Sequence, residues 1–254
     1  MPLIELRKVS KSFGRLVVLD EIDLAIDEGQ SLVVIGASGT GKSVLLKHIV
    51  GLLKPDSGEV WFDGKRIDEF SERELVPVRT QFGFLFQMGA LFDSMTVEEN
   101  VGFPLTEHSQ KTKAEIDQIV GQKLAMVGLP EVRKKMPAQL SGGQRKRVAL
   151  ARAIAMDPRV ILYDEPTTGL DPVRSDVINE LILKLKRQMK VTSIVVTHDM
   201  QSAYKVSDRI VMLNQGKIIF DGTPQEIQHS EDRFVQRFIH GEADQEELAS
   251  LGDT

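Results

Sequence analysis

Apolar residues near the start of the chain fall in short blocks that are typical of β-strands. Residues 3–9 alternate between apolar and polar side chains, and two further blocks follow at 17–19 and 22–26. Residues 31–35 form a continuous apolar run between turn residues, as expected of a strand buried on both faces. A glycine-rich segment leads from this strand into a predicted helix over 42–50. The predicted order is therefore strand, glycine loop, helix.

The rest of the chain alternates between helical stretches and short apolar strands. Helical spacing dominates residues 90–158, and an amphipathic helix is predicted over 173–190 because its apolar side chains recur on one face. The remaining strands are predicted at 59–62, 160–163, 193–196, 209–213 and 217–220.

The glycine-rich segment and the residues after it match the pattern G-x-x-x-x-G-K-[ST]. Glycine lets the backbone turn sharply around an anion, so that several N–H groups point at phosphates, and the following helix adds its positive end. Lys42 is expected to reach the β- and γ-phosphates of a nucleotide, and the Ser43 hydroxyl to bind Mg²⁺. The residues predicted to hold the nucleotide here are Gly36, Ser38, Gly39, Thr40, Gly41, Lys42 and Ser43.

Two adjacent carboxylates, Asp164 and Glu165, follow the apolar strand at 160–163. A buried carboxylate is costly without partners, and Mg²⁺, its waters and an attacking water would be such partners. We assign Asp164 to the metal side and Glu165 to the role of general base. His198 follows the strand at 193–196, at the carboxyl end where open α/β sheets bind ligands, and is a further candidate.

A second anion-binding feature lies about 100 residues after the glycine loop. Ser141 is a good N-cap for the helix that follows, and Gly142 and Gly143 leave the first N–H groups of that helix open. One pocket does not need two γ-phosphate sites from the same chain. The pair makes sense if two chains meet so that each site completes the other.

Composition narrows the class of protein. The chain has 254 residues, of which 41% are hydrophobic and 27% charged, as in globular proteins. The net charge of −5 argues against a nucleic-acid partner, and the lack of cysteine excludes disulfides, thiol catalysis and cysteine-based zinc sites. No apolar run approaches the roughly 18 residues of a membrane span, and the start lacks the apolar stretch of a signal peptide. We expect a cytosolic chain that does not itself cross a bilayer.

Taken together and in order, these motifs resemble the nucleotide-binding subunits of ATP-binding cassette (ABC) transporters over about residues 3–225. The segment 140–144, Leu-Ser-Gly-Gly-Gln, is the most specific part, and we call it the signature segment. The resemblance implies an α/β fold, in which a P-loop NTPase core of the RecA type with a parallel sheet carries an antiparallel β-edge subdomain and an inserted helical subdomain. It implies a single ATPase domain over 1–240, with a core lobe at 1–89 and 159–240, a helical lobe at 90–158, and an acidic tail at 241–254.

The resemblance also implies roles for single residues. Phe13 matches the aromatic residue that stacks on adenine, where tyrosine is commoner in the family. Gln87 matches the glutamine that contacts Mg²⁺ and the attacking water and senses the membrane partner. His198 matches the residue that contacts the γ-phosphate, and Asp171 the loop residue that communicates across the dimer. Ser141 and Gly143 match contacts to the γ-phosphate of the opposite protomer's ATP, and Gly142 and Gln144 complete that set.

Residues 84–94 indicate a subgroup within the ABC transporter ATPases. Residues 84–94 look like the ATPases of Mla-type and Mce-type bacterial lipid transporters, in which Gln-x-Gly-Ala-Leu-Phe recurs from a position matching Gln87. This implies an ATPase that powers phospholipid transport across the bacterial envelope, bound peripherally at the cytoplasmic face of the inner membrane. The implied partners are a second copy of the chain, an integral-membrane permease docking near 87–95, a lipid-binding domain protein and a small accessory subunit. The tail departs from this group after residue 241.

Three other functions stay open. The first is the ATPase of an importer for a small solute such as an amino acid. The second is a non-transport ABC ATPase that acts in DNA repair or on ribosomes, although 254 residues leave no room for the long insertions or tandem cassettes usual there. The third is a regulatory ATP-binding module without turnover, against which Glu165 and His198 both speak.

Overall fold

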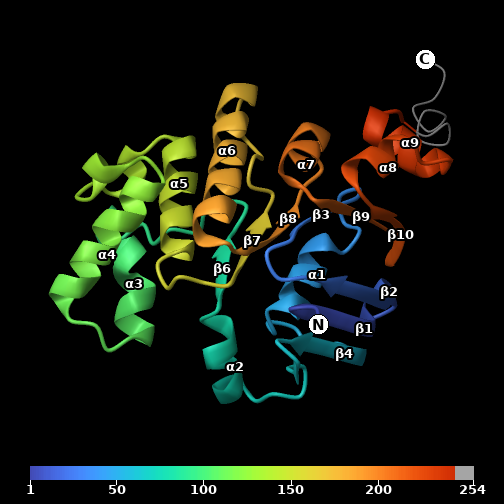
Figure 1. Cartoon of the computed structure of the whole chain (residues 1–254), viewed down its shortest axis with the longest axis horizontal. Coiled ribbons are helices and arrows are strands. Elements are labelled where there is room, and N and C mark those ends of the chain that lie inside the picture. Colours follow the sequence, from blue (N-terminus) through green and yellow to red (C-terminus); the bar gives the residue numbers. More distant parts are fainter. Residues whose placement is uncertain (244–254) are drawn as a thin grey trace.

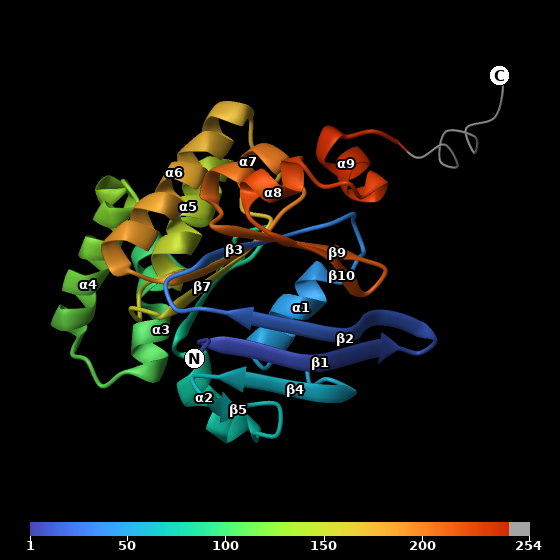
Figure 2. The ribbon, with the colours of Figure 1, turned by 45° about the vertical axis from the view of Figure 1, so that its right-hand side comes forward.

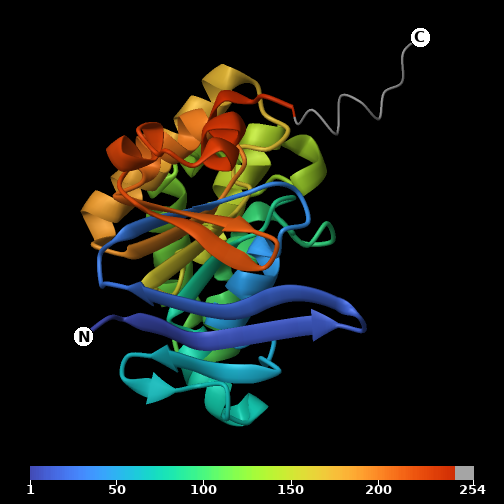
Figure 3. The ribbon, with the colours of Figure 1, turned by 90° about the vertical axis from the view of Figure 1, so that its right-hand side faces the viewer.

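The computed structural model describes residues 1–243, and these form two facing β-sheets with helices packed around them (Figures 1 and 3). The first sheet is antiparallel and has the order β2-β1-β4-β5. The second has the order β10-β9-β3-β8-β7-β6, and its strands run parallel except for β10. This confirms the α/β fold with an antiparallel edge that the family resemblance implies.

The strands are short apart from the first hairpin. Those of the antiparallel sheet are β1 (Ile4–Phe13), β2 (Leu16–Ile26), β4 (Ser57–Phe62) and β5 (Lys65–Arg66). Those of the mainly parallel sheet are β3 (Ser31–Ile35), β6 (Phe82–Leu85), β7 (Val160–Asp164), β8 (Thr192–Val196), β9 (Arg209–Asn214) and β10 (Lys217–Gly222).

Helix α1 (Lys42–Ile49) lies between the two sheets (Figure 2). Helices α3, α4 and α5 gather on the side of the molecule away from the antiparallel sheet (Figure 1). The other helices are α2 (Glu72–Arg79), α3 (Val97–His108), α4 (Lys113–Met126), α5 (Gly142–Ala153), α6 (Pro172–Met189), α7 (Met200–Val206), α8 (Pro224–Gln228) and α9 (Arg233–His240), with 3₁₀ turns at Pro130–Val132 and Pro137–Gln139.

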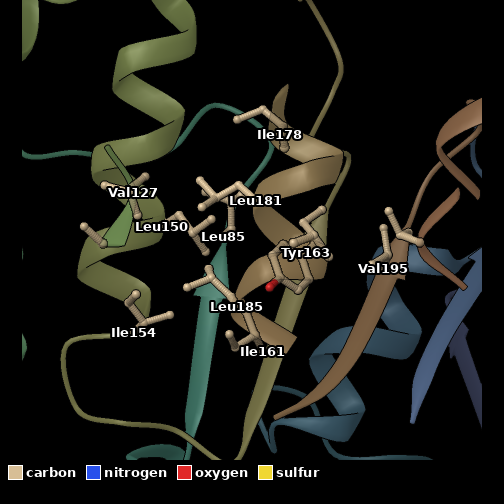
Figure 4. Packing of buried hydrophobic residues seen from close by; sticks show 14 of the residues in the cluster. Leu85, Val127, Leu150, Ile154, Ile161, Tyr163, Ile178, Leu181, Leu185 and Val195 are labelled. Atoms are coloured by element: carbon tan, nitrogen blue, oxygen red, sulfur yellow. The ribbon is translucent and has the colours of Figure 1, made fainter. Parts of the chain in front are cut away.

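Two apolar clusters fill the spaces between these layers. One joins the two sheets around α1, with Leu45 and Leu46 fully buried in it. The other joins the parallel sheet to the helices on its far face (Figure 4), where Tyr163 of β7 packs near Leu181 and Leu185 of α6. Because β3 and β7 contribute to both clusters, their carboxyl ends are held firmly, and the site is built at those ends.

The structure corrects the predicted elements in detail. The two strands predicted at 17–19 and 22–26 are one strand, β2, because a bulge at Glu21 (φ 48°) absorbs the break in the pattern. No prediction covers helices α2, α7, α8 and α9 or strands β5 and β6. Among the described residues, no helix is both long and apolar enough to span a membrane. The lobe boundaries at 90 and 158 stay predictions, and the predicted acidic tail lies outside the described residues from position 244 onward.

Candidate nucleotide-binding site

The glycine loop leaves β3 and enters α1 through a backbone path that only glycine can follow. A Cβ on Gly36 would lie 2.2 Å from the Leu213 carbonyl oxygen, and one on Gly41 would lie 2.8 Å from the Val18 carbonyl oxygen. Gly41 is the N-cap of α1 at φ 98°, and no side chain caps the helix. The first N–H groups of α1 are therefore left for a ligand at the loop, which is the geometry of an anion cradle.

Lys42 holds its charge inside this loop. The side chain is 7% exposed, and Nζ donates to the carbonyl oxygens of Gly36 at 2.7 Å and Ala37 at 2.8 Å. Burial lowers the pKa of the Lys42 ammonium, while the nearby charges of Glu165 and Asp164 oppose that shift. An ammonium has three N–H donors, so one donor stays available for a phosphate oxygen beside the two that fix its position.

Ser43 and Asp164 meet at the start of α1. The Ser43 hydroxyl donates to Asp164 Oδ1 at 3.2 Å, although the two residues are 121 positions apart. Burial, with a smaller contribution from the charge of Glu165, raises the pKa of Asp164, so a bound cation would relieve an unfavourable buried charge. Oxygen ligands of this kind suit Mg²⁺, and the described residues hold no group of three or more His, Cys, Asp or Glu side chains placed to bind a metal ion by themselves. Phosphate oxygens and water would complete the coordination, as is usual for Mg²⁺ with nucleotides.

Glu165 is held in place from several sides. Its backbone takes φ 50°, which is unusual for a residue other than glycine, and its N–H donates to the Val196 carbonyl oxygen at 2.9 Å. The Thr168 hydroxyl donates to Oε2 at 3.0 Å, and His198 Nδ1 lies 3.0 Å from Oε1. The Glu165 side chain is 13% exposed and that of His198 is 58% exposed. The carboxylate is therefore fixed, while the imidazole opens to solvent and to any ligand.

These groups line one pocket of about 400 Å³ at the carboxyl ends of β3, β7 and β8. Phe13 closes one side with a half-exposed ring, and Lys11 Nζ lies 5.7 Å from the ring centroid. Gly36 and Thr40 shape the loop behind the pocket without lining it. Of the residues that the sequence predicts, the lining brings together Phe13, Ser38, Gly39, Gly41, Lys42, Ser43, Gln87, Asp164, Glu165 and His198.

The signature segment lies elsewhere in the chain. Ser141 caps α5 in a capping box, in which its Oγ accepts from the Gln144 N–H and Gln144 Oε1 accepts from the Ser141 N–H. Asp171 caps α6 by accepting from the Arg174 N–H at 2.9 Å. Within the described part of the chain, neither these residues nor Gly142 and Gly143 line the pocket that holds Lys42.

Sequence reasoning missed the apolar part of the lining and one buried lysine. Val18, Val44 and Val196 line the pocket beside the polar groups, and no motif marks them, because valine is common in strands and helices of any protein. Lys146 is 7% exposed and donates to carbonyl oxygens of the loop after Glu165. Its only signal in the sequence is a position two residues after the signature segment.

A phosphate loop between a central parallel strand and its helix, with carboxylates at the end of a nearby strand of the same sheet, defines a P-loop nucleotide-binding protein. The family model of the ABC transporter matches residues 19–168 of the chain. The chain belongs to the ABC transporter family.

Several relatives and solved structures are similar to the chain. MlaF of Haemophilus influenzae, the ATP-binding protein of an intermembrane phospholipid transport system, is 43% identical over 95% of this chain and 92% of its own length. Mkl of Mycobacterium tuberculosis, a probable ribonucleotide transport ATP-binding protein, is 44% identical over 94% of this chain. The match covers 66% of the length of Mkl, so this chain spans less than two thirds of that relative. A dimeric post-hydrolysis structure of the cassette MJ0796 with ADP and Pi is 35% identical, with a TM-score of 0.80, covering 87% of this chain and 98% of that one.

Proposed function

We propose that the chain is the ATP-hydrolysing subunit of an ABC transporter that moves phospholipid across a bacterial envelope. The observation that carries the hydrolytic part is the single pocket in which Lys42 of the phosphate loop faces the fixed pair of Glu165 and His198. A binding module without turnover has no need of a carboxylate held 3.0 Å from an imidazole and 3.0 Å from the Thr168 hydroxyl.

The reaction is an in-line attack by water on the γ-phosphate of ATP. Glu165 takes the proton of the attacking water, and Lys42 and His198 stabilise the charge that grows on the phosphate oxygens. Ser43, Gln87 and Asp164 would hold Mg²⁺, which would neutralise the phosphate charge. Phe13 stacks on the adenine ring, for which its half-exposed ring is suited.

A second copy of the chain supplies the remaining contacts. A Cβ added to Gly142 or Gly143 would meet nothing of its own chain closer than 3.9 Å, so these glycines leave room for another molecule. Two chains sandwich two ATP molecules, and Ser141, Gly142, Gly143 and Gln144 of one protomer face the γ-phosphate bound by the other. Asp171, the N-cap of α6, takes part in communication across the dimer. The dimeric form of the 35%-identical cassette supports this arrangement.

Transport requires a partner in the membrane. Phe86, Met88 and Phe92 are exposed apolar side chains next to Gln87 and shortly after it. They lie beside a pocket whose lining is mostly apolar and includes Phe84 and Phe103. This region, 87–95, receives a short helix of an integral-membrane permease, which sets the chain at the cytoplasmic face of the inner membrane. A lipid-binding domain protein and a small accessory subunit complete the assembly. The phospholipid cargo follows from the resemblance of residues 84–94 and from the likeness to MlaF.

A different cargo is the second candidate, because the mycobacterial relatives are named for ribonucleotide transport. The cargo is tested on the complex of the chain with its membrane partner, purified from the source organism and placed in vesicles. ATP-driven movement of labelled phospholipid supports the proposal. Movement of a labelled ribonucleotide or amino acid instead refutes the lipid assignment and favours the small-solute importer.

The hydrolytic assignment is tested with Glu165→Gln, which keeps the shape of the side chain but removes the base. We expect the turnover number to fall roughly 10²- to 10⁴-fold, with ATP still bound and closed dimers accumulating, as measured by phosphate release and by size-exclusion chromatography with ATP. Normal turnover by this variant would exclude Glu165 as the general base.

A further inference from the structure

Lys146 of α5 is a buried cation without an acidic partner. Its side chain is 7% exposed, and among the described residues no carboxylate lies within ion-pair distance of it. Burial lowers the pKa of its ammonium, and only the charge of Glu165 opposes that shift. An apolar side chain at such a position would avoid the cost of desolvation. A buried lysine there indicates a task that an apolar residue cannot perform.

The ammonium is surrounded by carbonyl oxygens of one loop. Nζ donates to the carbonyl oxygens of Pro166 at 2.8 Å and Thr168 at 2.8 Å, and to that of Glu165 at 3.4 Å. Three acceptors match the three N–H donors of an ammonium. One side chain of α5 therefore fastens the backbone from 165 to 168, the loop that directly follows β7.

That loop carries the general base itself and one of the groups that orient it, the Thr168 hydroxyl. Glu165 itself sits at φ 50°, a backbone conformation that must be stabilised by its surroundings. Thr168, whose carbonyl oxygen accepts from Lys146, donates its hydroxyl to Glu165 Oε2 at 3.0 Å. Moving the 165–168 backbone would therefore move the carboxylate and the hydroxyl that holds it.

We propose that Lys146 is a positioning residue for ATP hydrolysis, which fixes the loop 165–168 and through it the carboxylate of Glu165. This inference rests on the proposed function, because it needs Glu165 to act as the base. Lys146 does not line the nucleotide pocket, so it acts on the base and not on ATP. Lys146 also connects α5, the helix that begins at the signature segment, to the loop that carries the general base Glu165 of the same chain.

The test removes the three donors with Lys146→Met, which keeps a long, unbranched side chain. We expect the kcat of the full-length chain to fall roughly 10- to 100-fold, since a small misplacement of a reacting group has effects of that size. The KM for ATP should change less than about threefold, because the pocket lining is intact. A kcat within about twofold of the unaltered chain would overturn the proposal.

The matched control is Lys123→Met on α4. Lys123 is also buried, at 5% exposure, and binds Asp157 away from the pocket. Both variants should lose thermal stability, but only Lys146→Met should lose kcat. An equal loss of kcat in the two variants would mean that Lys146 acts through general stability alone, and would refute a positioning role.

The pathway through Glu165 is tested by a double-mutant cycle. In a Glu165→Gln background, Lys146→Met should lower the residual turnover less than about twofold, because the group it positions is already gone. The full loss in that background would overturn the proposal. If Lys146→Met does not fold, Lys146→Gln, which keeps an N–H donor, takes its place in the same cycle. Absence of hydrolysis by the unaltered chain would instead refute the proposed function itself.

Discussion

Two helices of this protein begin at a sequence that is predicted to bind an anion, and their first turns differ. Helix α1 starts at Gly41, which has a left-handed backbone and no side-chain cap. Helix α5 starts at Ser141, whose capping box with Gln144 already satisfies two N–H groups. The first is built to take its ligand from within its own pocket. The second is capped by its own chain, so a ligand for it would come from another molecule.

The glycines at the starts of α1 and α5 also differ in whether their own chain requires them. Gly36 and Gly41 are required by their own chain, because a Cβ would collide with backbone oxygens at 2.2 and 2.8 Å. Gly142 and Gly143 are not, because a Cβ at either would lie at ordinary contact distance from its nearest neighbour. Glycine in a helix costs up to about 1 kcal/mol relative to alanine. A pair of them without an internal reason indicates close approach by another molecule.

The largest expected effect is at α1. Lys42→Ala removes the buried ammonium of the phosphate loop, and we expect ATP affinity to fall roughly 10- to 100-fold, the size usual for hydrogen bonds to charged groups. The measurement is nucleotide titration of the isolated chain by calorimetry. Lys47→Ala, an exposed lysine on the same helix, is the control and should bind as the unaltered chain does. Equal affinities of all three proteins would contradict the phosphate-cradle assignment.

A smaller effect of a different kind is expected at α5. Gly143→Ala should leave ATP affinity unchanged and should not lower thermal stability, because the added methyl group fits its own chain and alanine favours the helix. Turnover should nevertheless fall about tenfold or more, since the methyl group occupies space needed at the dimer interface. ATPase assays and sedimentation with ATP measure this. If turnover is retained, the open space at α5 has no role in assembly, and the comparison of the two helix ends fails.

The sequence predicted the α1 side of this comparison more fully than the α5 side. The phosphate loop is a local motif, so its strand, loop and helix follow from spacing over residues 31–50. Strand β6 was missed, because four residues with an internal Gly83 carry little periodic signal. The structure gives the reason for that glycine: a Cβ there would lie 2.4 Å from the Ala153 carbonyl oxygen at the end of α5.

Contacts between distant segments explain the rest of what was missed. Asp164 and Glu165 could be paired with the loop by fold-level reasoning, but the 3.2 Å contact to Ser43 spans 121 positions. The three carbonyl oxygens around Lys146 carry no sequence signal at all, because any residue has a carbonyl group. Motifs made of side chains can be recognised in the sequence. Contacts to backbone carbonyl groups can be identified only once the fold is known.

The C-terminal ends of α1 and α5 also differ, and the smallest expected effect, on the pH dependence of stability, comes from this difference. Arg152 near the end of α5 donates to the carbonyl oxygens of Gly89 and Ala90 and stays charged at any ordinary pH. His48 near the end of α1 is fully buried, and its Nδ1 lies 2.7 Å from the Val44 carbonyl oxygen. Burial lowers the pKa of His48 below 6.5. The unfolded chain therefore binds the proton first as the pH falls.

Stability should accordingly be complete above about pH 6.5 and should decline as the pH drops below that value, towards the lower pKa of the folded state. His48→Asn keeps a donor near the Val44 oxygen but cannot titrate. The difference in unfolding free energy between pH 7.5 and pH 5.5, from urea denaturation, should be smaller in this variant. His240→Asn is the control, because His240 has the same contact to a carbonyl oxygen four residues back but is exposed. If both variants reduce the difference in unfolding free energy between pH 7.5 and pH 5.5 equally, the burial of His48 within α1 does not cause the pH dependence.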